Sequence, residues 1–417
     1  GRFTIRVEEP ELPVVPGVVY VDHEATGNND GSSWENAFTD LQDGIALVGT
    51  NESIWIAEGT YHPSSTNDPS ERFLIPDASN VHGGFAGNEF LLDQREYGNN
   101  KTVLSAEIGD PNDQTDNSTY LIALSNGNIG IALDRVTISD VGPSSDRVLE
   151  IYNDNALVTD VELVNNNDEG NTVIARGEDT RMINCLIHNC GNGGTGGIIY
   201  SGLESHTELI NCTITNNSKA NGVYKEANGT FLIFNSIIQG NTIWGSFTTS
   251  GVEVYNSLIQ VSQDFVLVDC IVNEDAQFVD SNNNDYNLTS GSPAVGLGDN
   301  SNSTHPYDYI GNLRTQNTNV DAGCYESPFV RYGCSIVDGT NYDPFYEVED
   351  NSLCEDIPVC LGDFDGNGIV DSSDLLTFLG GMGNDYGCAY CGVDLDGDGA
   401  AGSADLLTFL ANFGNNC

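Results

Sequence analysis

Two stretches near the C-terminus place oxygen-bearing side chains at alternate positions. They are DFDGNGIVDSSDLLTFL at 363–379 and DLDGDGAAGSADLLTFL at 394–410. Each has Gly at its sixth position, which permits a sharp turn, and Asp at its twelfth. This is the ligand spacing of an EF-hand-type calcium loop, because alternate residues on a tight loop direct their oxygens to one centre. The spacing therefore predicts binding of Ca2+.

The two loops predict two sets of calcium ligands. The first set is Asp363, Asp365, Asn367, the carbonyl of Ile369, Asp371 and Asp374. The second set is Asp394, Asp396, Asp398, the carbonyl of Ala400 and Asp405, with a water beneath Gly402. Without the cation each loop crowds like charges together, so we expect this segment to need Ca2+ to fold. The alternative is a pair of acidic surface turns, which the repeat of the whole pattern disfavours.

Each loop runs directly into the helical pattern DLLTFL, and Pro358 and Cys360 leave no room for a helix before the first loop. A loop followed by a helix, twice, with Asp at the twelfth position, resembles the dockerin module over residues 360–417. The resemblance implies a docking tail that binds a cohesin-like receptor through helix residues, here 372–373 and 403–404. Dockerin-like repeats also occur as tail modules in secreted proteins without cohesins.

The cysteines predict an exported protein. Eleven cysteines are too many for a cytosolic protein of this kind, and an odd number leaves at least one outside an intrachain pair. The duplication allows two pairings in the tail: Cys360–Cys417 with Cys388–Cys391, or Cys360–Cys388 with Cys391–Cys417. We interpret the CAYC run as a structural staple rather than a redox or zinc pair. Without an initiator Met or signal peptide, we expect a mature form or a fragment.

The charge balance excludes whole classes of partner. The chain has 62 acidic residues against 13 Lys plus Arg, a net charge of −49. Nucleic acid and anionic membranes are excluded as partners, because no basic stretch is present to release their counterions. The sequence contains no run of about 18 apolar residues, so it predicts no membrane span. Together with the cysteines, this composition predicts a secreted, extracellular or cell-surface location.

A short motif of alternating apolar and polar residues recurs from about residue 103 to residue 288. Its copies are LDRVTI (133–138), VTDVELV (158–164), INCLIHN (183–189), INCTITN (210–216), FNSIIQG (234–240), YNSLIQ (255–260) and VDCIV (268–272). Strand repeats of 20–30 residues predict a solenoid, in which equivalent positions stack about 4.8 Å apart. We expect an inward column of small side chains: Cys185, Cys212, Ser236, Ser257 and Cys270. We expect turns at 165–167, Asn189, Asn216 and Asn241, where Asn tolerates left-handed geometry.

This repeat resembles right-handed parallel β-helices. The predicted fold class is mainly β, a parallel β-helix plus a small α-helical calcium module. A helix with Trp34, Phe38, Leu41 and Ile45 on one face, begun by Ser33, would cover the open end of the solenoid. With IWIAEGTYHP at 54–63 and YDYIGN at 307–312, the motif series over residues 18–326 resembles a family of secreted bacterial β-helix proteins. That family is of Bacteroidetes type and mostly uncharacterised.

The chain is predicted to have four segments: 1–17, a strand and Pro-rich leash; 18–326, the β-helix; 327–358, a small Asp/Cys-rich insert; 359–417, the dockerin-like module. The insert resembles a disulfide-closed element of the same bacteria, which implies a Cys334–Cys354 bridge. In the insert, Asp338, Asn341, Asp343 and Asp350 are candidate ligands for a third calcium, although an ordinary acidic loop is the preferred interpretation.

The β-helix resemblance also implies an enzymatic alternative. Lyases on this fold use an Arg or Lys base beside calcium-binding acids, and polygalacturonases use Asp pairs with GHG and RIK motifs; this chain has neither motif. Its candidate basic residues on the coils are Arg135, Arg147, Arg176, Arg181 and Lys225, with His188 and His206 nearby. None shares a clear coil register with an acidic pair, so we predict solvated side chains and no catalytic residue.

The N-terminus alternates Phe3, Ile5 and Val7, followed by prolines at 10, 13 and 16. This pattern indicates one strand on a stiff leash. It is either a linker, a strand folded back on its own solenoid, or a strand donated to a neighbouring molecule, which would build a filament.

The sequence favours a secreted calcium-binding structural or adhesive protein, with other copies of itself or a cohesin-like or cell-surface receptor as partners. The alternative is a polysaccharide-active β-helix lyase or hydrolase, or a glycan-binding module.

Overall fold

A computed structural model describes most of the chain. The described residues are 15, 17–127, 130–219, 221–226, 228–241, 252–260, 265–314, 318–333, 343, 345–349, 353, 362–365, 367, 369–382, 393, 395 and 402–414. The chain divides into two compact units, Gly1–Val330 and Arg331–Cys417. Among the described residues, no helix is long and apolar enough to cross a membrane.

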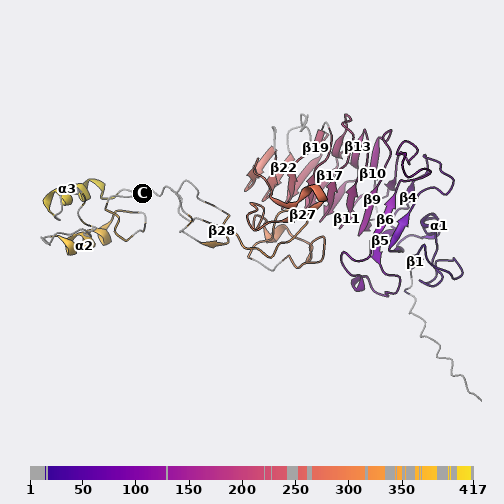
Figure 1. Ribbon diagram of the computed structural model, residues 1–417, viewed down its shortest axis with the longest axis horizontal. Coiled ribbons are helices and arrows are strands. Elements are labelled where there is room, and N and C mark those ends of the chain that lie inside the picture. Colours follow the sequence, from indigo (N-terminus) through magenta and orange to yellow (C-terminus); the bar gives the residue numbers. More distant parts are fainter. Residues whose placement is uncertain are drawn as a thin grey trace, which may run out of the picture. The chain divides into compact units, whose positions relative to one another are not determined.

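The first unit is a parallel β-solenoid built of three sheets (Figure 1). Sheet A contains β1 (Val18–Val21), β2 (Ser53–Ala57), β5 (Asn80–Phe85), β8 (Ile131–Asp134), β11 (Ala156–Thr159), β14 (Asp179–Ile183), β17 (His206–Ile210), β20 (Thr230–Phe234), β22 (Val252–Tyr255) and β24 (Phe265–Val268). Sheet B contains β3 (Gly59–Tyr61), β6 (Thr102–Ser105), β9 (Val136–Ser139), β12 (Glu162–Val164), β15 (Leu186–His188), β18 (Thr213–Thr215), β21 (Ile237–Gln239), β23 (Leu258–Ile259) and β25 (Ile271–Val272). Sheet C contains β4 (Phe73–Ile75), β7 (Ile122–Leu124), β10 (Arg147–Ile151), β13 (Asn171–Ala175), β16 (Gly197–Ser201) and β19 (Asn221–Lys225).

Each strand pairs in parallel with the equivalent strands of the coils before and after it. For example, Met182 of β14 lies opposite Leu209 of β17, which lies opposite Ile233 of β20. These three side chains are fully buried and belong to one apolar core that all three sheets enclose. The predicted parallel β-helix is confirmed by this pairing.

Each repeated motif turns a corner, which corrects the prediction that each is one strand. The motifs leave sheet A, bend, and enter sheet B. The residue at the bend is left-handed, with φ of 54° at Asn184, 53° at Asn211 and 48° at Asn235. Asn tolerates this conformation better than other residues with a Cβ. The predicted turns at Asn189 and Asn216 are confirmed, with φ of 51° and 54°.

Ladders of small polar side chains run along the inside of the solenoid. Cys212 N donates to Ser236 Oγ, and Ser236 N donates to Ser257 Oγ, both at 3.0 Å. Cys185 is fully buried above them, so the predicted inward column is confirmed there. Five of the described cysteines are free thiols: Cys185, Cys190, Cys212, Cys270 and Cys324. The six other cysteines, and every disulfide predicted from the sequence, lie outside the described residues.

The N-terminal helix is shorter than predicted. Helix α1 spans Leu41–Leu47, and its N-cap is Asp40, whose side chain accepts a hydrogen bond from Gln42 N at 2.8 Å. Trp34 lies before the helix and packs edge-on against Tyr20, with ring centroids 4.9 Å apart. The prediction that Ser33 begins the helix is therefore wrong, because an aromatic cluster holds this segment as a loop. The function of α1 as a cap stays a prediction.

The last part of the first unit returns across the solenoid. It contains β26 (Phe278–Asp280), η2 (Ser281–Asn283), β27 (Asp285–Leu288) and η3 (Asn300–Asn302). Cys324 N donates to Thr213 Oγ1 of β18 at 3.0 Å. The buried Arg314 guanidinium donates to Asn184 Oδ1 at 2.7 Å. The return segment thus covers part of sheet B and the corner beside it.

The second unit contains β28 (Tyr332–Gly333), β29 (Val348–Glu349), α2 (Ser372–Gly381) and α3 (Ser403–Asn412). Val370, Phe378, Val393 and Phe409 form its buried core. The rings of Phe378 and Phe409 stack with centroids 5.4 Å apart. Of the predicted ligands in the insert only Asp343 is described, and it forms an ion pair with Arg331 at 2.7 Å.

Candidate functional site

The first predicted calcium loop brings three of its acidic ligands together. Single carboxylate oxygens of Asp363, Asp365 and Asp374 all lie within 4.8 Å of one another. The carboxylate of Asp374 is buried and accepts backbone hydrogen bonds from Phe364 at 2.7 Å and from Asp371 at 2.9 Å. Burial acts to raise the pKa of Asp374, but these N–H donors outweigh it and lower the pKa. The loop therefore holds ionised oxygen ligands at one point.

The remaining predicted ligands of this loop form hydrogen bonds within it or begin the helix that follows. Asn367 N donates to Asp363 Oδ1 at 3.2 Å and to Asp365 Oδ1 at 3.1 Å. Ile369 N donates to Asn367 Oδ1 at 2.9 Å, and Asp371 is the N-cap of α2. A donor set made only of oxygen atoms fits Ca2+ better than a transition metal.

The second loop is described only in part. Asp394, Asp396, Asp398 and Ala400 lie outside the described residues. Asp405 is buried, and its carboxylate accepts hydrogen bonds from Leu395 N at 2.8 Å and Gly402 N at 2.6 Å. Asp405 thus repeats the backbone contacts of Asp374, as the duplication predicts for the twelfth position.

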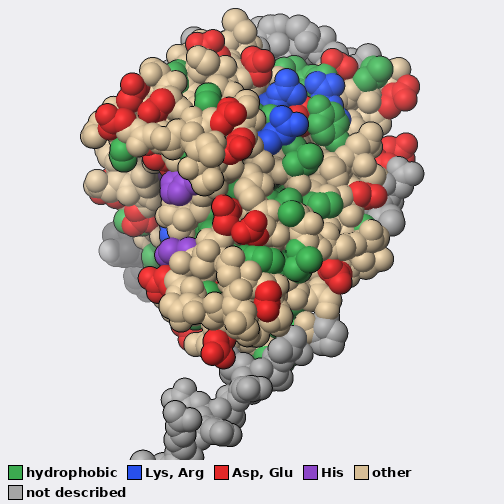
Figure 2. All heavy atoms as spheres, turned by 90° about the vertical axis from the view of Figure 1, so that its right-hand side faces the viewer, with side chains coloured by type: hydrophobic (Ala, Val, Ile, Leu, Met, Phe, Trp, Pro, Cys, Tyr) green, Lys and Arg blue, Asp and Glu red, His purple; other side chains and the backbone are tan. Residues whose placement is uncertain are grey.

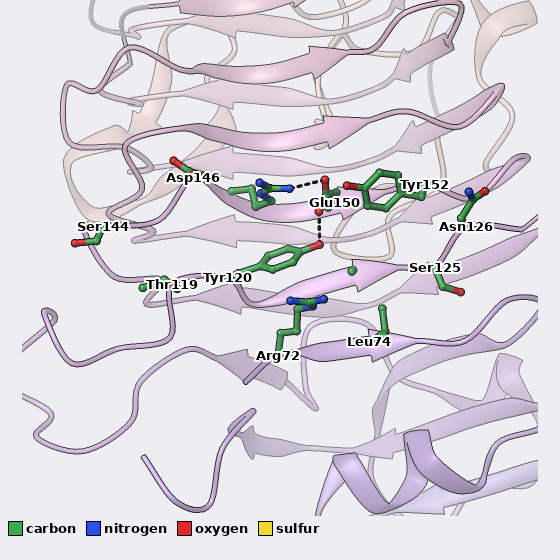
Figure 3. A pocket seen from close by; sticks show the side chains of 12 residues that line it. Arg72, Leu74, Thr119, Tyr120, Ser125, Asn126, Ser144, Asp146, Glu150 and Tyr152 are labelled. Carbon is green, nitrogen blue, oxygen red and sulfur yellow. Dashed lines mark hydrogen bonds and ion pairs between the residues drawn. The ribbon is translucent and has the colours of Figure 1, made fainter. Parts of the chain in front are cut away.

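A second cluster lies on the outer face of sheet C, and Figure 3 shows part of it. We call it the arginine–tyrosine patch. It consists of Arg72, Arg147, Arg176, Tyr120, Tyr152 and Tyr200 around Glu150. Figure 2 looks onto the right-hand side of Figure 1, and there most of the visible Lys and Arg side chains gather in one place beside hydrophobic ones, whereas the acidic side chains are spread out.

The register of sheet C explains this cluster. Leu74, Ala123, Glu150, Ile174 and Tyr200 lie opposite one another on successive strands and form one outward column. The small Ala123 leaves a shallow hollow of about 440 Å³ beside Glu150, with Tyr120 and Tyr152 on either side of it (Figure 3). The hollow is therefore a gap in a ladder of larger side chains.

Glu150 organises the patch from beneath. Glu150 is 1% exposed, and its carboxylate forms an ion pair with Arg147 Nη1 at 2.8 Å. Arg176 Nε lies 4.0 Å from the same carboxylate. Tyr120 Oη donates to Glu150. Burial, and then the contact with Glu150, raise the pKa of Tyr120 far above its usual value, so the phenol stays protonated.

The positive charge of the patch is partly balanced. Arg147 and Arg176 share the buried Glu150, Asp146 lies at the rim of the hollow, and Glu226 is hydrogen-bonded to Tyr200. Arg72 is exposed and its guanidinium lies 4.7 Å from the centroid of the Tyr120 ring. Arg176 lies 5.6 Å from the Tyr200 ring centroid. Among the described residues, no ion pair is formed by Arg72, so its planar donor fork is available to a ligand.

A third cluster lies over sheet B, where Glu162 is the centre. Its carboxylate contacts Lys101 Nζ at 3.3 Å, His188 Nε2 at 3.1 Å and Thr137 Oγ1 at 3.0 Å. Burial acts to raise the pKa of Glu162, but the hydrogen bond to His188 and the charge of Lys101 outweigh it and lower the pKa to about 2. His188 is 1% exposed and contacts Tyr286 of the return segment. This cluster is an internally satisfied ion-pair network.

The prediction that no candidate base shares a coil register with an acidic pair stays a prediction, but the structure places several of these bases beside single acids. Arg181 lies directly opposite Glu208 and its guanidinium is 2.9 Å from that carboxylate. His188 lies one coil from Glu162, and Arg147 is three residues from Glu150. A coil length of 27 residues, which the INC motifs at 183 and 210 display, pairs Arg181 with Glu208. Sequence reasoning missed Arg72, Glu150 and the tyrosines, because the strands of sheet C carry no repeated motif.

Comparisons with known proteins identify no family. No protein-family model matches the chain, and no curated protein matches its sequence. Among solved structures, pectate lyase Pel9A is similar at 15% identity over 74% of this chain and 96% of that one, with a TM-score of 0.42. A rhamnogalacturonan lyase is similar at 13% identity over 59% of this chain and 69% of its own, with a TM-score of 0.34. Pectin methylesterase PemA from Erwinia chrysanthemi is similar at 14% identity over 60% and 80%, with a TM-score of 0.31. At these values the likeness carries no argument about activity, and the fold rests on the strand pairing described above.

Proposed function

We propose that the solenoid binds an acidic polysaccharide along the outer face of sheet C. The observation that supports this most strongly is the arginine–tyrosine patch. Three of only 13 Lys and Arg residues gather on one face of a chain whose net charge is −49. A cluster of basic residues is not expected in so acidic a chain, so a local requirement to bind an anion explains it best.

The chemistry of the patch fits a carboxylated sugar. A guanidinium group binds a carboxylate through two parallel hydrogen bonds, and its planar fork also stacks on aromatic rings. Tyrosine offers an apolar face to the C–H groups of a sugar ring and a hydroxyl group to its oxygens. Arg147 and Arg176 are 34% and 45% exposed at the side chain, so both remain reachable while Glu150 holds them in place.

The spacing of the arginines fits a polymer rather than a single sugar. Arg72 precedes β4, Arg147 begins β10 and Arg176 follows β13, so the three are spread over four successive coils of sheet C. Neighbouring coils lie about 4.8 Å apart, so the arginines span about 14 Å along the solenoid. A linear polyuronate lying along the sheet would meet more than one guanidinium group.

Binding of polygalacturonate and of its methyl ester tests this proposal. We expect isothermal titration to show binding of the acidic polymer and at least about tenfold weaker binding of the uncharged ester, because the ester cannot accept a bidentate ion pair. Equal binding of the two polymers would contradict the proposal. Release of shorter or unsaturated sugars in the same samples would show a lyase or hydrolase instead of a binding protein.

A second function is supported by the cluster of Asp363, Asp365 and Asp374, namely binding of Ca2+ by the second unit. The three carboxylates would share the cation with the other oxygens of the loop. Titration of the metal-free protein with CaCl2 tests this. We expect binding that Asp365→Asn weakens at least about tenfold and that the exposed control Asp68→Asn leaves unchanged. Calcium and a carboxylated polymer both suit an extracellular protein, which is the location we propose.

A further inference from the structure

The two ends of sheet A differ in how its core is covered. The outermost strands are β1 at one end and β24 at the other. At the β1 end, Val21 is fully buried, and Leu41 and Ile45 of α1 lie in the same core. In Figure 1 the label of α1 lies beside that of β1, and β22 lies at the opposite end of the solenoid.

At the β24 end a core column ends in contact with solvent. Leu209, Ile233, Val254 and Leu267 lie opposite one another on β17, β20, β22 and β24. The first three are 0% exposed, whereas Leu267 is 36% exposed. Its neighbours Val266 and Val268 are 51% and 39% exposed. Within the described part of the chain, no strand pairs with the outer edge of β24. An apolar edge strand of this kind is a template for a further strand.

We propose that residues 3–7 of a second copy add to β24 as the next parallel strand. This segment alternates Phe3, Ile5 and Val7 with polar residues, as a strand does whose one face is buried. Added beside β24, its apolar face would cover Leu267 and continue the core column by one coil. The occupant is thus a named segment of this chain, and the contact is strand addition.

The length of the leash requires that the donor be another copy. Residues 8–17 join the segment to β1, and ten fully extended residues span at most about 36 Å. Sheet A has ten strands, so β1 and β24 are nine inter-strand spacings apart, which amount to about 43 Å. The segment therefore falls short of the β24 edge of its own solenoid. It leaves its own molecule at the β1 end, where the β24 end of a second solenoid stacked on it would be within reach.

Charge complementarity supports the same partner. The N-terminal segment carries Arg2 and Arg6, two of the few basic residues in the chain. The β24 end presents exposed acidic side chains at Asp269, Glu274 and Asp275, which follow β24 and β25 directly. Opposite charges on the two surfaces favour encounter and fix the register of the added strand. Because donor and acceptor lie at opposite ends, the contact does not close and builds a filament.

Mixing two complementary variants tests the proposal. One variant lacks residues 1–9 and keeps the acceptor edge; the other is Leu267→Lys, which keeps the donor and spoils the edge. By analytical ultracentrifugation and negative-stain electron microscopy, we expect the unaltered protein to form filaments and each variant alone to stay monomeric. An equimolar mixture should form dimers and stop there, because only one productive interface exists in it. Leu203→Lys, at a leucine that is 58% exposed elsewhere on the solenoid, should assemble like the unaltered protein.

Several results would overturn the proposal. An unaltered protein that stays monomeric would show that β24 takes no second copy, as would happen if the second unit of the same chain covered it. Filaments formed by the deletion variant or by Leu267→Lys would show a different interface. A mixture that stays monomeric, with both variants folded by circular dichroism, would also contradict strand donation.

Discussion

Glu150 shows how one residue sets the character of a surface. It is buried on an otherwise outward column, and its carboxylate is held by Arg147 and by the Tyr120 hydroxyl group. Without a ligand, this carboxylate prevents the guanidinium groups from repelling one another. A buried carboxylate beneath exposed arginines therefore stabilises the patch without covering it.

Replacement of Glu150 by Gln tests this role. The substitution keeps the shape of the side chain and removes its charge, so Arg147 and Arg176 lose their shared counterion. We expect a loss of about 1 to 2 kcal/mol in the free energy of unfolding, less than for a fully enclosed pair, because Arg147 is 34% exposed. Urea denaturation measures this, with the exposed Glu178→Gln as control. Equal midpoints for the two variants would show that Glu150 is not a structural anchor.

Glu162 makes the stability of the solenoid depend on pH. Its pKa is about 2 in the folded protein and about 4.3 in an unfolded chain. The unfolded state therefore binds protons first as the pH falls, and the stabilisation is complete above about pH 5 and lost toward pH 2. Asp134, with a pKa of about 2, acts in the same direction, while burial raises the pKa of Asp160 to about 6 and opposes both below that pH.

We expect Glu162→Gln to reduce the loss of unfolding free energy between pH 7 and pH 3 by about 1 to 2 kcal/mol. Urea midpoints measured from pH 7 to pH 3 would show this as a smaller fall than in the unaltered protein. Glu178→Gln, at an exposed carboxylate, should leave the fall unchanged. If Glu162→Gln loses stability on acidification as steeply as the unaltered protein, the ion pairs with His188 and Lys101 do not lower this pKa.

At the scale of the element, a ladder of Asn side chains at the turns that follow sheet B fixes how one coil stacks on the next. Asn217 Oδ1 accepts a hydrogen bond from Cys190 N, and its Nδ2 donates to Ile187 O, both at 2.9 Å. Asn166 and Asn241 make the same type of contact one coil before and one coil after. These side chains satisfy backbone groups that the bends would otherwise leave without partners.

Asn217→Ala should therefore cost about 1 to 3 kcal/mol in the free energy of unfolding, because it leaves buried backbone groups unsatisfied. The exposed Asn88→Ala is the matched control and should change stability by less than about 0.5 kcal/mol. Thermal and urea denaturation measure both. A stability loss no greater than that of the control would mean that the ladder is replaceable by water or by small shifts of the coils.

The sequence allowed the turns at Asn189 and Asn216 to be predicted, but neither the bends inside the motifs nor the patch. Asn and small residues recur at the bends because few other residues adopt left-handed geometry there, so a periodic signal marks them. The acidic loops follow the spacing that calcium geometry dictates, and binding of Ca2+ to them stays a prediction. Glu150 lies on β10, whereas Arg72 and Tyr120 lie just before β4 and β7, and only the register of the folded coils brings them together. The shortened helix α1 shows the opposite effect, in which the aromatic cluster around Trp34 overrides a helical pattern.

At the scale of the whole molecule, the two units should respond separately to calcium. The first unit has a continuous apolar core of its own, whereas the core of the second is small and lies beside its acidic loops. Small domains of this type depend on the ion for folding. We expect a chelator to abolish amide protection of Leu375 and Leu406 while β11 and β14 stay protected. Hydrogen exchange measures this, and unchanged protection of α2 and α3 would contradict calcium-dependent folding.

The net charge of −49 gives the polysaccharide proposal its sharpest test, because the molecule as a whole repels the ligand we propose. The decisive measurement is the affinity for polygalacturonate of the double variant Arg72→Gln, Arg176→Gln, compared with the unaltered protein. The control is Arg181→Gln, at an arginine that is 57% exposed on sheet A. We predict that the double variant binds at least about a hundredfold more weakly and that the control binds normally. Equal affinity in all three proteins, each folded, would show that the arginine–tyrosine patch does not bind acidic polysaccharide.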